Sequence, residues 1–470
     1  MSSNSQPSGH AVLFPFMAKG HTIPLLHLAR FLLSRNLAVT VFTTPSNRPF
    51  ISHSLSDTKS SIIDLPFPQS IPDIPAGVES TDRLSSMSLI PSFVLATKSI
   101  QPHFELALEC LIPRVTFVVS DGFLWWTLDS TSKFGVPRLV FYGICAYANS
   151  LARVVIKNLL PGRNESNNES ITVPTFPWIK VTKNDFDAMI SDPEPNRTPA
   201  SGVFMNCVKS TMSSFGMLFN SFYELEPLFV DFWNRECQPR AWCIGPLCLA
   251  QPVKSESSNK PVWIQWLDQK LDQDCPVLYV AFGSQAEVSP EQIKEIAIAL
   301  EESNVNFLWV IRKKESEISD IGFENRVKSR GLVVRDWVDQ REILMHESVQ
   351  GFLSHCGWNS VLESICAGVP ILAWPMMAEQ PLNAKMVVEE IKVGLRVETC
   401  DGSVKGFVRS EGLKKMVKAL MEGDKGKDVR KKTKEVAAMA NKAVEEGGSS
   451  WSSLESLINE ICQGQAVKLI

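Results

Sequence analysis

The chain lacks several features that would place it in a functional class at once. Its 470 residues include 47 Lys and Arg against 51 Asp and Glu, a formal net charge of −4, so no basic excess points to nucleic acid. No run of about 18 apolar residues is present, which argues against a membrane-spanning helix. No GxGxxG follows a predicted strand, which disfavours a nicotinamide-dependent dehydrogenase. These absences leave a small molecule as the expected partner.

The chain also lacks paired cysteines and a basic N-terminal start. Eleven cysteines are scattered singly from Cys110 to Cys462, with no close CxxC pair. This spacing disfavours a disulfide framework and a zinc site, and favours reduced thiols in the cytosol. The N-terminus has no basic start, and its apolar run from Ala11 to Ala18 is too short for a span. We therefore expect a soluble, cytoplasmic protein with no stable membrane insertion.

Length and hydrophobic pattern predict two α/β domains. A chain of this size exceeds one typical core, and two domains of roughly 200 residues are expected. Buried-strand patterns alternate with helical segments in both halves, for example HAVLFPFMA and VTFVVSD in the first and PVLYVAFGS and PILAWP in the second. This alternation predicts two doubly wound, Rossmann-like sheets, with ligands at the carboxyl ends of the strands. The polar stretch 250–261 divides them into residues 1–250 and 251–450.

The sequence also predicts an irregular insertion and a C-terminal helix. Residues 161–199 are rich in Asn, Ser, Pro and acid, which predicts a long irregular insertion containing the Asn-Glu-Ser sequences at Asn164 and Asn168. The segment after 450 has apolar residues at helical spacing and predicts a final helix. Those apolar residues are Trp451, Leu454, Leu457, Ile458 and Ile461.

The segment from Trp337 to Gln380 carries the most chemistry. Its centre, GFLSHCGWNSVLES, predicts a short strand, a turn at 355–357 and a helix beginning near Trp358. The first N–H groups of a helix have no intrahelical partner and the dipole places positive charge there, so this turn can hold a phosphate. His355, Asn359 and Ser360 add side-chain donors at the same place.

The other polar and aromatic side chains of this segment suit the remaining parts of a nucleotide sugar. Glu363 lies one turn further along the same helix face, where a carboxylate would repel a diphosphate but could accept ribose hydroxyls. Trp337 precedes the turn and can stack on a base. Glu379 and Gln380 end the segment as an acid and an amide suited to a polyhydroxylated group. The order base, diphosphate, ribose and sugar predicts a nucleotide sugar as the ligand.

The segment resembles the signature box of plant secondary-product glycosyltransferases, the family 1 UDP-glycosyltransferases. It is similar in its length of 44 residues, its leading Trp337, its HCGWNS, its Glu363 and its closing Glu379-Gln380. The resemblance implies the GT-B fold, in which two Rossmann-like domains face each other across a cleft. It also implies that the last helix, about 451–470, packs back on the N-terminal domain, and that the protein is a monomer.

The resemblance assigns the donor contacts residue by residue. The contacts are to uracil and ribose by Trp337, Val338, Gln340 and Glu363, to the diphosphate by Ser284, His355, Gly357, Asn359 and Ser360, and to the sugar by Trp358, Glu379 and Gln380. A closing Gln in this family accompanies glucose more than galactose. Gly143 falls near the place where some relatives have a hydroxyl residue against the sugar, and its lack of a side chain leaves that contact open.

A general base is expected after the first strand. Histidine is the natural choice because its ordinary pKa lies near working pH, and His21 follows Gly20 in the loop after HAVLFPFMA. Gly20, His21 and Pro24 are similar to the GHxxP of the family's catalytic site. Asp121 ends the strand VTFVVSD and resembles the family's second catalytic residue, which would hold the imidazole. From the residues alone, Asp121 could equally be the N-cap of the following helix.

We expect no metal and no other cofactor. Asp272 and Asp274 fit the DxD motif of metal-dependent glycosyltransferases, but they precede a strand, and a helix N-terminus with His355 could stabilise the leaving diphosphate instead. The expected reaction is inverting transfer of a sugar, favoured to be glucose, to a hydroxyl of a phenolic, flavonoid or terpenoid acceptor. Two alternatives remain: a non-hydrolysing nucleotide-sugar epimerase and a non-catalytic UDP-sugar-binding protein. The aromatic residues expected to line the acceptor site are Phe16, Trp125, Phe141, Phe176 and Trp178.

Overall fold

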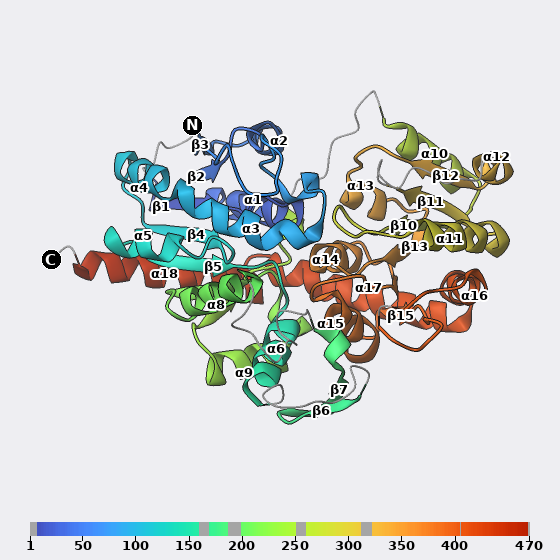
Figure 1. The fold of residues 1–470 in the computed structure, drawn as a ribbon. Coiled ribbons are helices and arrows are strands. Elements are labelled where there is room, and N and C mark those ends of the chain that lie inside the picture. Colours follow the sequence, from blue (N-terminus) through green and yellow to red (C-terminus); the bar gives the residue numbers. More distant parts are fainter. Residues whose placement is uncertain are drawn as a thin grey trace. The chain divides into compact units, whose positions relative to one another are not determined.

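The computed structural model describes residues 7–158, 169–186, 199–250, 260–311, 322–404 and 406–468. Its contacts divide the chain into two compact units, whose elements are labelled in Figure 1. Unit 1 comprises Met1–Ala146, Glu194–Pro252 and Ala443–Ile470, and unit 2 comprises Tyr147–Pro193 and Val253–Lys442. The predicted polar boundary at 250–261 lies mostly outside the described residues.

Unit 1 is built around a parallel sheet, which within the described ranges has seven strands in the order β3-β2-β1-β4-β5-β8-β9. Most of its strands are buried, because continuous apolar sequence suits a sheet covered on both faces. The strands are β1 His10–Phe14, β2 Ala38–Thr43, β3 Ser61–Asp64, β4 Phe117–Asp121, β5 Arg138–Phe141, β8 Gly216–Phe219 and β9 Ala241–Cys243.

The helices of unit 1 include the predicted C-terminal one. Arg240, the residue before β9, and Glu460 of the last helix form an ion pair at 3.0 Å, and the Ser450 hydroxyl donates to the carbonyl of Gly245. The helices are α1 Lys19–Leu33, α2 Arg48–Ser54, α3 Ile90–Ala96, α4 Gln101–Cys110, α5 Thr127–Lys133, α8 Pro199–Met212, α9 Pro227–Glu236 and α18 Ser449–Lys468.

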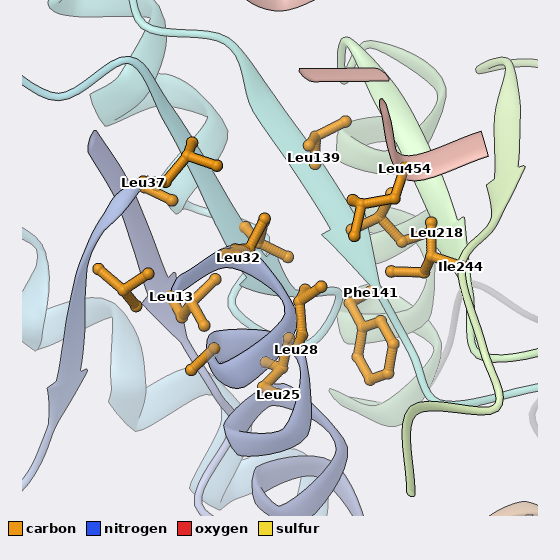
Figure 2. Close-up of a cluster of buried hydrophobic side chains, with 14 of the residues drawn as sticks. Leu13, Leu25, Leu28, Leu32, Leu37, Leu139, Phe141, Leu218, Ile244 and Leu454 are labelled. Atoms are coloured by element: carbon orange, nitrogen blue, oxygen red, sulfur yellow. The ribbon is translucent and has the colours of Figure 1, made fainter. Parts of the chain in front are cut away.

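The main core of unit 1 joins segments from both ends of the chain. Figure 2 shows Leu25, Leu28 and Leu32 of α1 packed near strand residues such as Leu139 and Phe141 of β5. On the other side of the same cluster, Leu454 of α18 lies with Leu218 and Ile244 (Figure 2). The apolar spacing that predicted the last helix therefore serves burial in the core of unit 1, and Leu457 and Ile461 are each 1% exposed.

Unit 2 contains a second parallel sheet, with six strands among the described residues in the order β12-β11-β10-β13-β14-β15. The strands are β10 Val277–Ala281, β11 Asn306–Val310, β12 Gly331–Val334, β13 Val349–Ser354, β14 Ile371–Ala373 and β15 Gly394–Arg396. The helices are α6 Ala146–Asn158, α10 Val262–Asp272, α11 Pro290–Ser303, α12 Phe323–Val327, α13 Gln340–Leu344, α14 Trp358–Cys366, α15 Gln380–Lys385, α16 Ser410–Met421 and α17 Asp424–Val444.

The segment 161–199 differs from the predicted irregular insertion. Residues 159–168, with Asn164 and Asn168, and 187–198 lie outside the described residues, but 169–186 forms an antiparallel hairpin of β6 Ile171–Val173 and β7 Phe176–Val181. The alternation of buried and exposed side chains in FPWIKV explains the strand.

The hairpin groups with unit 2. The predicted division at residue 250 had placed it in the N-terminal domain instead. Two polar contacts hold the hairpin within unit 2. Lys385 Nζ lies 3.9 Å from Asp185 Oδ2, and Trp178 Nε1 donates to Glu390 Oε2 at 3.3 Å. Phe176 is buried and Trp178 is 54% exposed, with their ring centroids 5.6 Å apart. Among the described helices, none has both the length and the hydropathy needed to cross a bilayer.

Candidate active site

Four of the predicted site residues end or follow the strands that flank the point in each sheet where the strand order reverses. In unit 1 this point falls between the paired strands β1 and β4, and in unit 2 between β10 and β13. Loops at the carboxyl ends of such strands run in opposite directions and leave room for a ligand. Asp121 ends β4 and His21 lies in the helix that follows β1, while Ser284 and His355 follow β10 and β13.

His21 and Asp121 form one hydrogen-bonded pair. His21 Nδ1 lies 2.7 Å from Asp121 Oδ2, and the side chains are 23% and 0% exposed. With its hydrogen on Nδ1, the imidazole donates to the carboxylate, and Nε2 carries the lone pair that can accept a proton. The other carboxylate oxygen accepts the N–H of Phe123 at 2.9 Å. A carboxylate held in this way fixes the orientation and tautomer of the ring.

The alternative role for Asp121, as a helix N-cap, is not found. The next helix, α5, begins at Thr127, and Trp126 before it makes no side-chain capping bond. Asp121 instead bonds within the turn that directly follows β4.

His21 stands in the first turn of α1, where the sequence predicted a loop. The helix begins at Lys19 and contains Pro24. The carbonyl of Ala18 accepts the N–H groups of His21 and Thr22 at 3.0 and 2.8 Å, and the Thr22 hydroxyl donates to the carbonyl of Phe16 at 3.1 Å. These bonds close a helical turn ahead of the proline, which had indicated a later start.

Two phenylalanine rings lie beside the imidazole of His21. The ring centroids of Phe16 and Phe123 are 5.6 and 5.4 Å from that of His21, and 5.1 Å from each other. Phe16 was among the predicted acceptor residues, whereas Phe123 was missed, although its place two residues after Asp121 was a usable signal. Phe141 belongs to the hydrophobic core of Figure 2 and is fully buried. The surroundings of His21 suit an apolar molecule.

In unit 2, the turn between β13 and α14 is built around the imidazole of His355. A Cβ on Gly283, after β10, or on Gly357, before α14, would lie 2.6 Å from His355 Nε2. Gly283 also has a φ of +77°, which glycine adopts without strain. Two glycines therefore let the loops after β10 and β13 close on one ring, and this places the segment of Ser284 beside the turn.

His355 is a neutral group with an unsatisfied atom. Burial lowers the pKa of this imidazole to about 4, so it carries no charge near neutral pH. Its Nδ1 is buried and has no hydrogen-bond partner among the described residues. A buried polar atom without a partner is costly, and a bound ligand can satisfy it.

The start of α14 suits an anion. The helix begins at Trp358, as predicted, and its N-cap Gly357 offers no side chain to the first N–H groups. The first turn, which contains Asn359 and Ser360, has no acidic residue, so the positive end of the helix dipole is not neutralised there.

Gln340, Ser360 and Glu363 form a hydrogen-bonded cluster. Gln340 Nε2 donates to Ser360 Oγ at 2.8 Å and to Glu363 Oε2 at 2.6 Å. The Tyr279 hydroxyl donates to Gln340 Oε1 at 3.4 Å. Burial raises the pKa of Glu363 to about 7, although the bond from Gln340 opposes the shift. The carboxyl group is therefore poorly hydrated and suited to accept hydroxyl hydrogens from a ligand.

Glu363→Gln should change how stability depends on pH. Because the pKa of Glu363 is raised from 4.5 to about 7 in the folded protein, its favourable contribution is present below about pH 4.5 and is lost as pH rises through about 7. The variant should therefore be more stable than the wild type at pH 8, by on the order of 3 kcal/mol, and the advantage should vanish near pH 4.5. Denaturant unfolding of both proteins at several pH values measures this. His355 titrates in both proteins and cancels in the comparison, and a difference independent of pH would contradict the prediction.

Trp337 and Val338, the residues predicted to contact the uracil, lie on a loop that is anchored at its end. Trp337 is 61% exposed, as a stacking platform must be before its ligand arrives, while Val338 is 7% exposed. Asp339 caps α13, with its side chain accepting the N–H of Glu342 at 3.3 Å. The cap holds the loop at the helix that carries Gln340.

Asn383 joins Glu379, which was predicted to contact the sugar, to the turn at 355–357, which was predicted to contact the diphosphate. The sequence analysis did not name Asn383. Asn383 Nδ2 donates to the carbonyl of Cys356 at 2.9 Å and to Glu379 Oε1 at 3.4 Å. Gln380 Oε1 accepts two backbone N–H groups at 3.0 and 2.9 Å, so its amide nitrogen is the group left to donate to a ligand. Trp358 is 2% exposed and packs inside.

The candidate DxD motif lies outside this arrangement. Asp272 is the last residue of α10, and Asp274 stands in the turn before β10. Within the part of the chain that the structure describes, no three His, Cys, Asp or Glu residues are grouped to hold a metal ion.

Comparison with known proteins decides the family. The profile of the family "UDP-glucoronosyl and UDP-glucosyl transferase" matches residues 271–430. UDP-glycosyltransferase 90A1 of Arabidopsis thaliana is 56% identical over 97% of each chain. The chain belongs to the UDP-glycosyltransferases. As an enzyme of this family, it transfers sugar from a UDP-sugar to small-molecule acceptors.

Solved plant glycosyltransferase structures confirm the GT-B fold. The Glycyrrhiza uralensis UGT73P12 structure, complexed with glycyrrhetinic acid 3-O-monoglucuronide, has a TM-score of 0.86 at 29% identity and covers 98% of this chain and 97% of its own. The Phytolacca americana UGT2 structure, complexed with UDP-2fluoro-glucose and pterostilbene, has a TM-score of 0.79 at 29% identity and covers 96% and 99%. The predicted fold class and family are therefore right for this glycosyltransferase.

Proposed function

We propose that this enzyme moves glucose from UDP-glucose to a hydroxyl of a small lipophilic acceptor, with inversion at the anomeric carbon and without a metal ion. In this proposal His21 is the general base and Asp121 orients it. The observation that carries the proposal is the 2.7 Å contact between His21 Nδ1 and the buried carboxylate of Asp121. The two phenylalanine rings beside His21 support an apolar acceptor.

The proposed step uses the residues of both units. Nε2 of His21 takes the hydroxyl proton of the acceptor, and the oxygen forms a bond to the anomeric carbon as the bond from that carbon to the UDP oxygen breaks. The departing diphosphate gains negative charge, which the unneutralised N-terminus of α14 and the ring of His355 would stabilise. Asp121 stabilises the imidazolium that forms.

The donor assignment is supported by the predicted contacts in unit 2. Glu363 would accept the ribose hydroxyls, and the amide nitrogen of Gln380, whose oxygen is occupied by the backbone, would donate to the sugar. The Phytolacca americana relative was solved with a fluorinated analogue of UDP-glucose and with pterostilbene, which supports glucose and a lipophilic acceptor here.

The test is a matrix of donors and acceptors. UDP-glucose, UDP-galactose and UDP-glucuronic acid are each incubated with phenolic and terpenoid alcohols, with and without EDTA, and products are identified by mass and by the anomeric proton coupling. We expect the highest kcat/KM with UDP-glucose, β-linked products from the α-linked donor, and no effect of EDTA. Retention of configuration, loss of activity with EDTA, or an epimer formed without any acceptor would each overturn the proposal.

A further inference from the structure

Arg138 is a buried cation directly behind the proposed base pair. It lies on β5, beside β4, and its residue is 1% exposed. Its Nε donates to the Ser120 hydroxyl at 2.7 Å, and one terminal nitrogen donates to the carbonyl of Asp121 at 3.3 Å. The other donates to the Ser214 hydroxyl at 2.8 Å and reaches that of Ser210 at 3.5 Å. The guanidinium therefore holds the end of the strand that carries Asp121.

All these partners are neutral, which leaves the charge of Arg138 without a direct ion pair. Among the described residues, none of the ion pairs includes it. Burial lowers the pKa of Arg138 to about 10, so the side chain is still a cation at neutral pH. Isolated buried charges are strongly disfavoured, and one persists only where a nearby opposite charge compensates for it.

Asp121 supplies the compensating charge. The ionisable groups that face Arg138 come from four elements: Asp121 on β4, Tyr142 after β5, Cys207 on α8 and Asp129 on α5. Burial raises the pKa of Cys207 to about 12 and that of Tyr142 further still, so both are neutral at working pH. Of the two remaining carboxylates, only Asp121 is bonded to Arg138 through its backbone and fully buried beside it.

We infer that Arg138 is a positioning residue for the reaction, whose buried cation beside Asp121 limits how tightly His21 holds its proton. The inference rests on the proposed function, in which His21 must be neutral before the reaction. A buried carboxylate alone would hold a proton on the imidazole. The guanidinium opposes this, because it repels the positive charge of an imidazolium.

The test is the pH dependence of kcat/KM in two neutral variants, Arg138→Gln and Arg138→Met. Gln keeps a donor for the serines, while Met matches the length of the side chain and removes the buried charge, so at least one should fold. In both, the acid limb of the profile should move to higher pH by about 1 unit or more, the size of shift that one adjacent opposite charge produces. Activity at pH 6 should fall at least about tenfold more than activity at pH 8.5.

Two controls separate charge from packing. Arg138→Lys keeps the cation and should keep the acid limb within about 0.3 unit, even where the rate falls, because the shift depends on charge. Ser214→Ala removes one hydrogen bond to the guanidinium and should also leave the limb in place. Calorimetric UDP binding and thermal unfolding establish that each variant is folded. An unmoved limb in the neutral variants, or an equal shift in Arg138→Lys, would overturn the inference.

One further variant distinguishes this inference from the proposed function. If His21→Ala retains wild-type turnover, the proposed base is wrong, and with it the role of Arg138. If His21→Ala loses turnover while the neutral Arg138 variants keep the wild-type pH profile, only the role of Arg138 is wrong.

Discussion

His21→Ala should lower kcat by about 10²–10⁴-fold, the range that a positioned general base contributes, while the affinity for UDP stays unchanged. The reason lies in the placement of the two groups on different units. His21 and its partner Asp121 belong to unit 1, whereas the residues predicted to bind UDP belong to unit 2. Removing the imidazole takes away the proposed proton acceptor and leaves the predicted uridine and diphosphate contacts in place. Steady-state rates and calorimetric UDP titration measure the two effects separately.

The control for this experiment is His103→Ala, an exposed histidine on α4 of the same unit, which should retain wild-type kcat. Asp121→Asn provides a graded second variant, because the amide preserves the shape of the side chain but not the charge that stabilises an imidazolium. It should lower kcat without changing UDP affinity. Equal turnover by His21→Ala and the wild type would exclude His21 as the base, and weakened UDP binding would point to a structural role.

Trp337→Ala should weaken the binding of UDP by about 5- to 150-fold, because stacking of a base on an aromatic ring contributes about 1–3 kcal/mol. The indole is 61% exposed, so truncation removes little packing from the folded protein and stability should barely change. Titration calorimetry with UDP and with inorganic diphosphate measures the effect. Loss of affinity for UDP but not for diphosphate identifies the base as the contact.

Trp178→Ala is the matched control, since this other exposed indole of unit 2 is 54% exposed and lies on the hairpin. It should leave UDP affinity unchanged. Trp337→Phe should recover most of the loss, because a phenyl ring still offers a flat surface. If alanine at 337 left UDP affinity at the wild-type value, the assignment of Trp337 to uracil would be wrong.

The sequence predicted most of the two parallel sheets and the turn at 355–357 because both depend on local patterns. Buried parallel strands are continuous apolar runs, and β1, β4, β10 and β13 were each found within one or two residues at their start. The helix at Trp358 began as predicted, since a glycine before a run of helix-forming residues marks that boundary. The start of α1 was misplaced because the bonds to the carbonyl of Ala18 outweighed the signal of Pro24.

What could not be predicted depends on contacts between residues far apart in the chain. Asn383 joins the turn at Cys356 to Glu379 through two hydrogen bonds that no local sequence pattern predicts. Nothing in the local sequence distinguishes Arg138 from other strand residues. Only the pairing of β5 with β4 places its charge beside Asp121. The family resemblance predicted the site residues but not the groups that hold them.

The return of α18 to unit 1 has a consequence for biosynthesis. The leucines and isoleucines of α18 complete a core whose other residues lie between Ala11 and Leu247 and are therefore synthesised earlier. Between Pro252 and Ala443 the ribosome must add the bulk of unit 2, which takes roughly 10–40 s at about 5–20 residues per second. During that interval the nascent chain exposes the apolar surface that Leu454 and Leu457 later cover, and it is then most exposed to aggregation and most dependent on chaperones.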